Sequence, residues 1–130
     1  MITLHLKDTT AIGKITNEIA VSFSDELVTV KEIIIKRVMA EVEHYNNKMP
    51  EYFRGLVEPG EAEKTLNGYK LKAKRKVDPE QQGLVALDAF KKNAYFVLID
   101  NIQAESLDQM ISINEQTNIS FLQLTPLVGG

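Results

Sequence analysis

Alternation of apolar and polar residues at the start of the chain predicts a half-buried β-strand. Ile2, Leu4 and Leu6 share one parity, and polar residues, His5 among them, take the other. A second run with the same period predicts another strand, and its apolar positions are Ile15, Ile19, Val21 and Phe23. We expect the two strands to pair as an antiparallel hairpin connected by residues 8–14.

A long amphipathic helix is expected next. Thr29 and Glu32 have the spacing of a capping box, in which both side chains satisfy free N–H groups at a helix start. Apolar residues then recur at steps of three and four, namely Val30, Ile33, Ile34, Val38, Val42 and Tyr45, with Ile35 and Met39 widening the stripe. We expect charged residues such as Arg37 and Glu41 to face solvent, and the helix to stop near Asn46-Asn47.

Residues 49–77 have the least regular pattern in the chain. We expect residues 61–66 to form one or two helical turns that stop at Asn67-Gly68. The alternation that begins at Tyr69 predicts an edge strand or extended arm, and its basic side chains are Lys70, Lys72, Lys74, Arg75 and Lys76. Two interpretations stay open: these cations protect a sheet edge from aggregation, or they form a basic docking patch for an acidic partner or nucleic acid.

The sequence Asp78-Pro79 predicts the start of a second helix, with aspartate as the N-cap and proline at the first helical position. We expect this helix to stop near residues 91–93 and to bury Leu84, Val85, Leu87 and Phe90. The apolar run over residues 95–99 predicts a central strand, after which Asp100-Asn101 turns the chain. Another short strand is expected around residues 110–113, followed by a polar turn over residues 114–118.

The last stretch of the sequence predicts a buried strand that ends in an extended segment. Ile119 and Phe121 alternate with Ser120, while Leu122 and Leu124 add apolar residues on the other parity. The strand is expected to end before Pro126, which donates no backbone hydrogen bond. Residues 125–130 are then expected to form a flexible tail that reaches about 15 to 20 Å from the body.

The sequence closes on Gly129-Gly130, for which two interpretations are possible. Chain ends tolerate glycine, so the pair is compatible with no function at all. Alternatively, the carboxylate of Gly130 is the reactive group, because two glycines make the thinnest segment that can enter a narrow enzyme channel.

Composition narrows the possible classes of function. The chain has 130 residues, 44% of them hydrophobic and 25% charged, which is typical of a globular domain. It contains no cysteine, which excludes disulfides, thiolate metal sites and a thiol nucleophile. No secretion signal or membrane segment is recognisable, so a cytoplasmic protein without a membrane partner is expected. The net charge of −3 gives no general attraction to nucleic acid, which makes a nucleic-acid partner unexpected.

No constellation of catalytic residues is recognisable. His5 and His44 are the only histidines, and neither has a carboxylate or serine at the spacing of a known site. Gly13-Lys14 lacks the other residues of a phosphate-binding loop. We therefore expect a protein that is not an enzyme, holds no metal or cofactor, and serves as the substrate of other enzymes.

Several segments together resemble the closing half of the ubiquitin-like β-grasp superfamily. These are residues 95–101, 107–108, 117–122 and 126–130. They are most similar to the sulfur-carrier branch, which includes the small subunit of molybdopterin synthase and the thiamine sulfur carrier. The resemblance covers about the last 36 residues and, by element order alone, the first 45. It implies an α+β protein with a β-grasp fold, in which a mixed sheet of four to five strands packs on the long helix.

The resemblance also implies the domain organisation and the site residues. Residues 1–130 are expected to form a single domain, with an insertion over about residues 47–80 that leads into the second helix. In the resembling families, a partner enzyme uses ATP to adenylate the terminal glycine, which assigns activation to Gly130 and the second thin position to Gly129. The segment that docks on partners would comprise Leu122, Leu124, Pro126, Leu127 and Val128. Leu122 and Leu124 have this role only if their side chains face outward.

Three functions stay open on this evidence. The first is a ubiquitin-like modifier of a prokaryotic conjugation system, with an activating enzyme, a conjugating enzyme, a deconjugating protease and an acceptor protein as partners. The second is a sulfur carrier that forms a C-terminal thiocarboxylate, and the third is an interaction module that is never conjugated. The chain is about half as long again as typical sulfur carriers, which favours the modifier, because a protein read by several partners needs more surface.

Overall fold

The computed structural model describes residues 1–123 and shows an α+β protein built on a mixed five-stranded sheet. The strand order is β2 (Ile15–Phe23), β1 (Ile2–Thr9), β9 (Ile119–Gln123), β6 (Tyr95–Ile99) and β7 (Ile102–Gln103). β1 and β9 run parallel, and the other neighbours are antiparallel. The predicted opening hairpin, mixed sheet and closing strand are therefore confirmed as far as Gln123.

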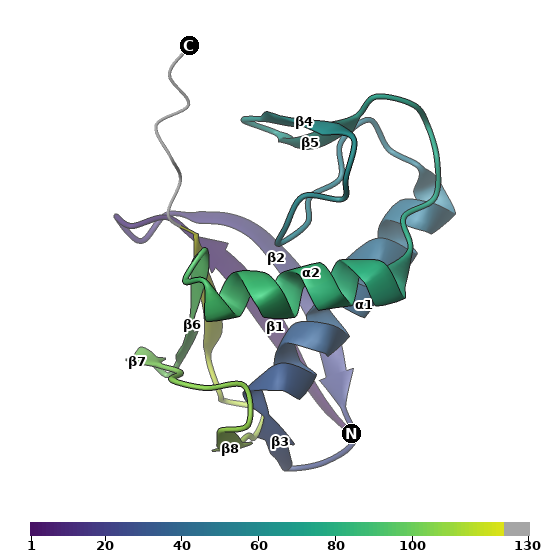
Figure 1. Ribbon diagram of the computed structural model, residues 1–130. Helices are drawn as coiled ribbons and strands as arrows, with labels where there is room; N and C mark the ends of the chain where they lie inside the picture. The colour runs from purple at the N-terminus through teal and green to yellow at the C-terminus, as the bar shows by residue number, and fades with distance from the viewer. Residues whose placement is uncertain (124–130) are drawn as a thin grey trace.

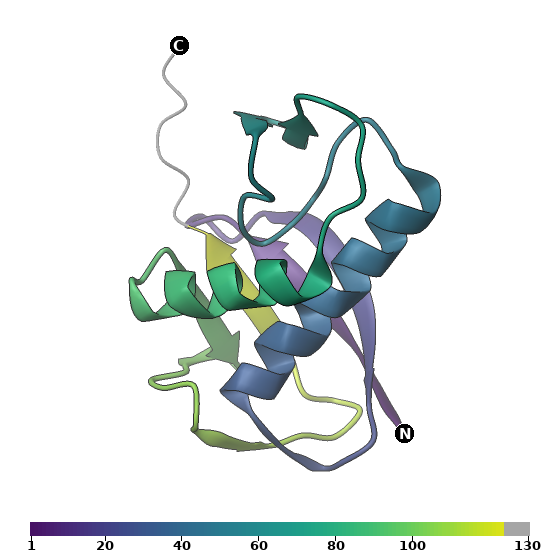
Figure 2. The same cartoon turned by 45° about the vertical axis from the view of Figure 1, so that its right-hand side comes forward.

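Both helices cover the same face of this sheet, as Figures 1 and 2 show from two directions. α1 (Val30–Lys48) begins at Thr29, whose Oγ1 accepts a hydrogen bond of 3.1 Å from the N–H of Glu32. α2 (Pro79–Lys91) begins at Asp78, whose carboxylate accepts one of 3.0 Å from the N–H of Glu80. Both predicted helix starts are confirmed, because side-chain caps are local signals that the sequence states directly.

The hydrophobic core lies between the sheet and the helices. Leu6, Val97 and Phe121 from the sheet are completely buried, as are Ile33 and Ile34 from α1. α1 runs to Lys48, slightly beyond the predicted stop, and Met49 ends it with a left-handed backbone at φ 45°.

Two small sheets complete the fold. β3 (Leu27–Thr29) pairs with β8 (Met110–Ser112) at the start of α1. β4 (Ala62–Thr65) pairs with β5 (Gly68–Leu71) in the segment that connects α1 to α2. The expected helical turns over residues 61–66 are wrong, because this stretch includes β4. Gly68, at φ 123°, closes the turn of a hairpin, and backbone hydrogen bonds of 2.7 and 2.9 Å join Tyr69 to Phe53. These contacts override the helical propensity of the glutamates and lysine before the turn.

The buried face of α2 differs from the predicted one. Leu84 and Val85 are 64% and 37% exposed, whereas Gln82, Gly83, Ala86 and Phe90 are buried. A Cβ at Gly83 would lie only 3.0 Å from Cδ1 of Ile35 on α1. The two helices therefore approach each other through small residues, which turns Leu84 and Val85 away from the core. Within residues 1–123, no helix is both long and apolar enough to cross a membrane.

Candidate functional site

The predicted activation residues Gly129 and Gly130 lie outside the described residues. The same holds for Leu124, Pro126, Leu127 and Val128 of the expected docking segment, and for the extended conformation predicted over residues 125–130. The structure places the residues that precede them: β9 ends at Gln123, between β1 and β6. The surroundings of that strand end therefore define the candidate site.

Leu122 belongs to the face of the sheet that the helices leave open. Ile119 and Phe121 are fully buried on the helix side, so Leu122 lies on the opposite parity and is half-buried. Its register partner on β6 is Phe96, and Leu98 follows on the same parity. These three side chains form an apolar surface, here called the open-face patch, that does not contribute to the main core.

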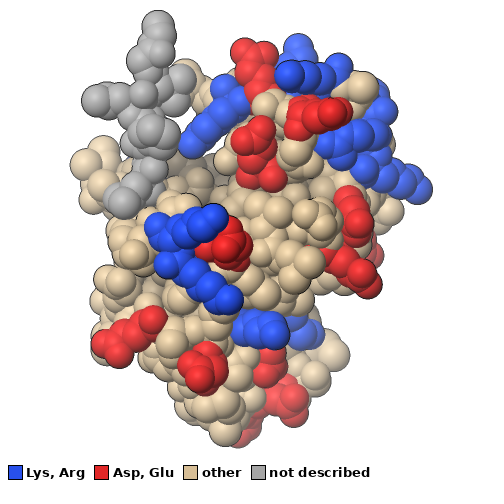
Figure 3. Space-filling model, in the orientation of Figure 1, with Lys and Arg blue, Asp and Glu red and all other residues tan. Residues whose placement is uncertain are grey.

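The predicted basic side chains do not form one uniform patch. Lys70 lies on β5 and pairs with Glu51 at 3.8 Å, while Lys72, Lys74 and Lys76 are exposed along the segment after β5. The guanidinium of Arg75 donates to the carbonyl oxygens of Pro59 and Gly60 at 3.0 and 2.6 Å, which gives this residue a structural role. Figure 3 shows acidic and basic side chains side by side over this part of the molecule.

A groove of about 490 Å³ lies beside the end of β9. The connection between β1 and β2 forms one wall, the β4–β5 hairpin and the residues around Arg54 form the other, and Gln123 also lines it. Lys14, Arg54 and Lys64 line this groove and are exposed, so we call it the basic groove. Sequence reasoning missed it because its walls come from segments that only the fold brings together.

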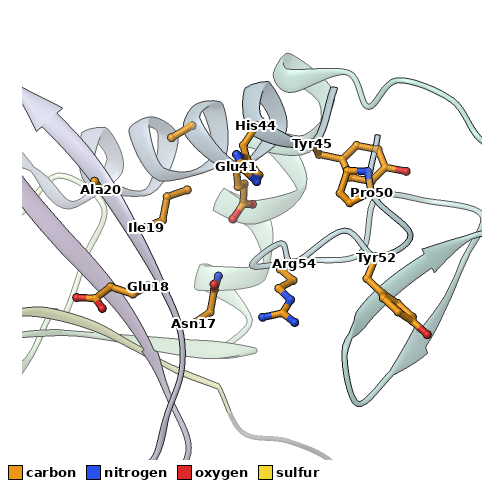
Figure 4. A pocket seen from close by; sticks show the side chains of 11 residues that line it. Asn17, Glu18, Ile19, Ala20, Glu41, His44, Tyr45, Pro50, Tyr52 and Arg54 are labelled. Atoms are coloured by element: carbon orange, nitrogen blue, oxygen red, sulfur yellow. The ribbon is translucent and has the colours of Figure 1, made fainter. Parts of the chain in front are cut away.

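A second hollow of about 620 Å³, here called the helix-side pocket, lies between β2, the second half of α1 and residues 50–54. Figure 4 shows His44 and Tyr45 on the helix and Tyr52 on the loop around it. Glu18 and Glu41 contribute carboxylates to the lining of this pocket, and Arg54 contributes a cation. Arg54 lines both hollows, so it stands between them.

A buried ion network lies beneath both hollows. The guanidinium of Arg37 is bidentate to Asp8 on β1, with Nη1 on Oδ1 and with Nη2 at 2.8 Å from Oδ2. Its Nε donates to Oε2 of Glu41, one helical turn further along α1, at 3.1 Å. The three residues are 0%, 6% and 5% exposed in the order Arg37, Asp8 and Glu41. The expectation that Arg37 and Glu41 face solvent is wrong, because each finds an opposite charge inside the fold.

Glu41 of this network and two other polar side chains hold the segment between the helices. Oε1 of Glu41 accepts a hydrogen bond of 3.2 Å from the N–H of Leu56. The amide of Asn46 bonds both backbone groups of Val77, at 2.8 and 2.9 Å, and Gln82 donates to the carbonyl of Val57 at 2.9 Å. Polar side chains on both helices therefore fix the position of the chain that carries the basic groove.

The sequence does contain a signal for the network. The buried positions of α1 are Val30, Ile33, Ile34, Arg37, Val38, Glu41, Val42 and Tyr45. Arg37 and Glu41 occupy regular places in this stripe of three- and four-residue steps, so the helical period alone assigns them to the buried face. If every charged residue is assigned to the solvent face because it is polar, the burial of Arg37 and Glu41 is not predicted.

Burial sets the ionisation of the two helix residues. Desolvation opposes the charge of Arg37, but attraction to Glu41 and hydrogen bonding to Asp8 outweigh it and raise the pKa of Arg37 above its ordinary value. Desolvation also raises the pKa of Glu41 to about 7, against the opposing attraction of Arg37. Glu41 is therefore the group in this network that takes up a proton near neutral pH.

This ionisation predicts a pH dependence of stability. The unfolded chain releases the Glu41 proton near pH 4.5 and the folded protein near 7, so the folded state holds more protons between these values. The free energy of unfolding should fall over this interval by about 3 kcal/mol from this group. In urea titrations from about pH 4 to 8, Glu41→Gln should flatten the decline, whereas Glu43→Gln, an exposed position on the same helix, should retain it. Equal slopes for both variants would contradict the assignment.

Within the described residues, no group of His, Cys, Asp and Glu side chains has the geometry to hold a metal ion. His44 is exposed at the rim of the helix-side pocket, and His5 is exposed on β1. A comparison with protein-family models, curated proteins and solved structures finds no match for this chain.

Proposed function

We propose that this chain is a ubiquitin-like modifier with a β-grasp fold. The carboxylate of Gly130 attacks the α-phosphorus of ATP on a partner activating enzyme, and pyrophosphate leaves. A cysteine of the partner then displaces AMP from the resulting mixed anhydride and forms a thioester, and an amine of the acceptor protein displaces the thiol. The chain supplies the carboxylate for the first step, and the thiol of the second step comes from the partner, which agrees with the absence of cysteine from this chain.

The observation that carries this proposal is the position of β9. This strand lies in the middle of the sheet, parallel to β1 and antiparallel to β6, and it ends at Gln123. The sequence that follows contains Pro126 and then Gly129-Gly130. An opening hairpin, a helix across one face and a closing strand beside the first strand support the β-grasp assignment.

The open-face patch supports the same proposal. An activating enzyme must recognise the folded body as well as the diglycine, and the half-buried side chains of Phe96, Leu98 and Leu122 offer apolar surface on β6 and β9. This surface is continuous with the strand that leads to the diglycine, so one partner can contact both.

Intact mass spectrometry tests the proposal. The chain, produced with Gly130 as its last residue, is incubated with ATP and each adenylating enzyme of the ubiquitin-activating type from the same organism. A thioester to that enzyme that reducing agent cleaves, or a lysine-linked adduct, is the expected result. Exchange of one oxygen for sulfur at Gly130 would identify a sulfur carrier instead. No change with an enzyme that is active on ATP would contradict both and leave an interaction module.

A further inference from the structure

The basic groove carries an unbalanced positive charge. Lys14, Arg54 and Lys64 line it, and within residues 1–123 none of them forms an ion pair. Asp8 is the only acidic residue among the described lining residues, and its charge is already paired with Arg37. Among residues 1–123, the groove therefore presents three cations and no free carboxylate, on a chain whose net charge is negative.

The two walls of the groove also present aliphatic side chains to solvent. Leu66, in the turn of the β4–β5 hairpin, is 90% exposed, and Ile15, at the start of β2, is 53% exposed. Exposed aliphatic groups beside unpaired cations form a surface that is apolar and basic at once. Such a surface fits an occupant with both carboxylates and an aliphatic side chain.

The groove is held in shape by the structure beneath it. On one wall, Gly68 sits against the carbonyl of Phe53, to which a Cβ would come within 2.9 Å. Tyr69 and Phe53 exchange backbone hydrogen bonds, which fixes the hairpin to the loop that carries Arg54. On the other wall, Asn17 donates to Asp8 at 3.4 Å. The three cations therefore extend from positions that the fold defines, which reduces the entropic cost of binding.

We propose that the basic groove binds an acidic peptide segment bearing an aliphatic residue, on the protein that takes up the diglycine segment. This inference rests on the proposed function for the identity of the partner. The groove lies beside Gln123, which precedes Gly130 by seven positions in the sequence, so a partner seated there contacts the end of the strand that leads to the diglycine. A peptide fits better than nucleic acid, because Tyr69 is the only aromatic residue among the described lining residues and bases bind by stacking on several.

Fluorescence anisotropy with a labelled Glu-Glu-Leu-Asp-Glu-Leu-Glu-Glu peptide tests the groove without ATP or any enzyme. Reversal of its cations in Lys14→Glu, Arg54→Glu and Lys64→Glu combined should weaken binding at least about tenfold. The matched control combines Lys72→Glu, Lys74→Glu and Lys76→Glu, which changes net charge equally on exposed residues outside the groove, and it should change affinity by less than about twofold. Equal losses in both triples, or a larger loss in the control, would overturn the proposal.

Two further measurements identify the occupant. Leu66→Ala should weaken peptide binding about threefold or more, whereas Leu84→Ala, an exposed leucine on α2, should not. A peptide with glutamine and asparagine in place of the acids should not bind. If a single-stranded oligothymidylate binds through the same cations more tightly than the acidic peptide, the groove is a nucleic-acid site and the proposal is wrong.

The peptide assay separates this proposal from the proposed function. Activation of Gly130 with no peptide binding would overturn the groove alone, and peptide binding without activation would overturn the modifier alone. If the peptide binds and Gly130 is activated, the variant with Lys14→Glu, Arg54→Glu and Lys64→Glu combined should raise the KM of the activating enzyme for this chain at least about tenfold. Its kcat should stay unchanged, because the groove contributes binding and not chemistry.

Discussion

Replacing Arg37 by methionine is expected to lower the free energy of unfolding by about 3 to 5 kcal/mol, the largest stability effect of any single substitution proposed for this protein. Methionine fills much of the same space, so the loss comes from charge more than from volume. The carboxylates of Asp8 and Glu41 would stay buried without the cation that pairs with both. Packing contributes as well, because the guanidinium carbon lies 4.6 Å from the ring centre of Phe121.

Urea denaturation followed by circular dichroism measures the effect as a change in midpoint. The matched control is Lys31→Met, which removes a cation from an exposed position on the same helix and should cost less than about 0.5 kcal/mol. Adding Asp8→Asn and Glu41→Gln to Arg37→Met should recover at least about 1 kcal/mol, because the neutral amides need no counter-charge. A loss below about 1 kcal/mol for Arg37→Met, or no recovery in the triple variant, would show that carboxylates left without their cation are not the source of the loss.

The consequences of that loss reach the surface. Asp8 lines the basic groove, and Glu41 lines the helix-side pocket and holds the backbone of Leu56. The network thus ties β1, α1 and the segment between the helices together at the point where both hollows open. A buried ion network often stabilises no more than apolar side chains of similar volume do. Here its hydrogen bonds join residues that line the two hollows, so we expect the network to hold their walls in position.

The sequence predicted the elements whose signals are local. Thr29 and Asp78 cap the helix starts with their own side chains, so these starts are predictable from single residues. The alternation of apolar and polar residues in β1 and β2 predicts a sheet with one buried face. The sequence did not predict the hairpin over β4 and β5, because the contacts that select it over a helix come from Phe53, distant in the chain. The packing of α2 was also not predicted, because α2 contacts α1 through Gly83 and the prediction placed only large apolar residues in the contact.

The candidate site was less predictable than the fold, for the same physical reason. Arg37 and Asp8 are 29 residues apart, and no local pattern states that they will pair. The basic groove takes its cations from the β1–β2 connection, the loop after α1 and strand β4, whereas a basic run read from the sequence points to residues 70–76. A cluster of basic residues in the sequence therefore need not form a basic site, because the fold determines which cations lie together. The diglycine is proposed as part of the site from the sequence alone, because it lies outside the described residues.

The largest functional effect is expected at Gly130. Deleting this residue, or replacing it by phenylalanine, should reduce adenylation at least about 100-fold in kcat/KM. Deletion moves the carboxylate by one residue, and a shift of even about 1 Å from the productive geometry costs this much. Phenylalanine keeps the carboxylate but adds a ring that a channel shaped for two glycines cannot admit. Pyrophosphate exchange with the activating enzyme measures the loss.

Stability separates this effect from misfolding. The buried core of the described residues is formed by side chains up to Phe121, so both Gly130 variants should unfold within about 0.5 kcal/mol of the wild type. Adding one glycine before Met1 alters chain length without moving the Gly130 carboxylate, and this variant should be adenylated normally. If both Gly130 variants are adenylated as fast as the wild type, the diglycine is not the activated group. If they unfold much more readily, residue 130 belongs to the folded body and cannot enter a partner's active site.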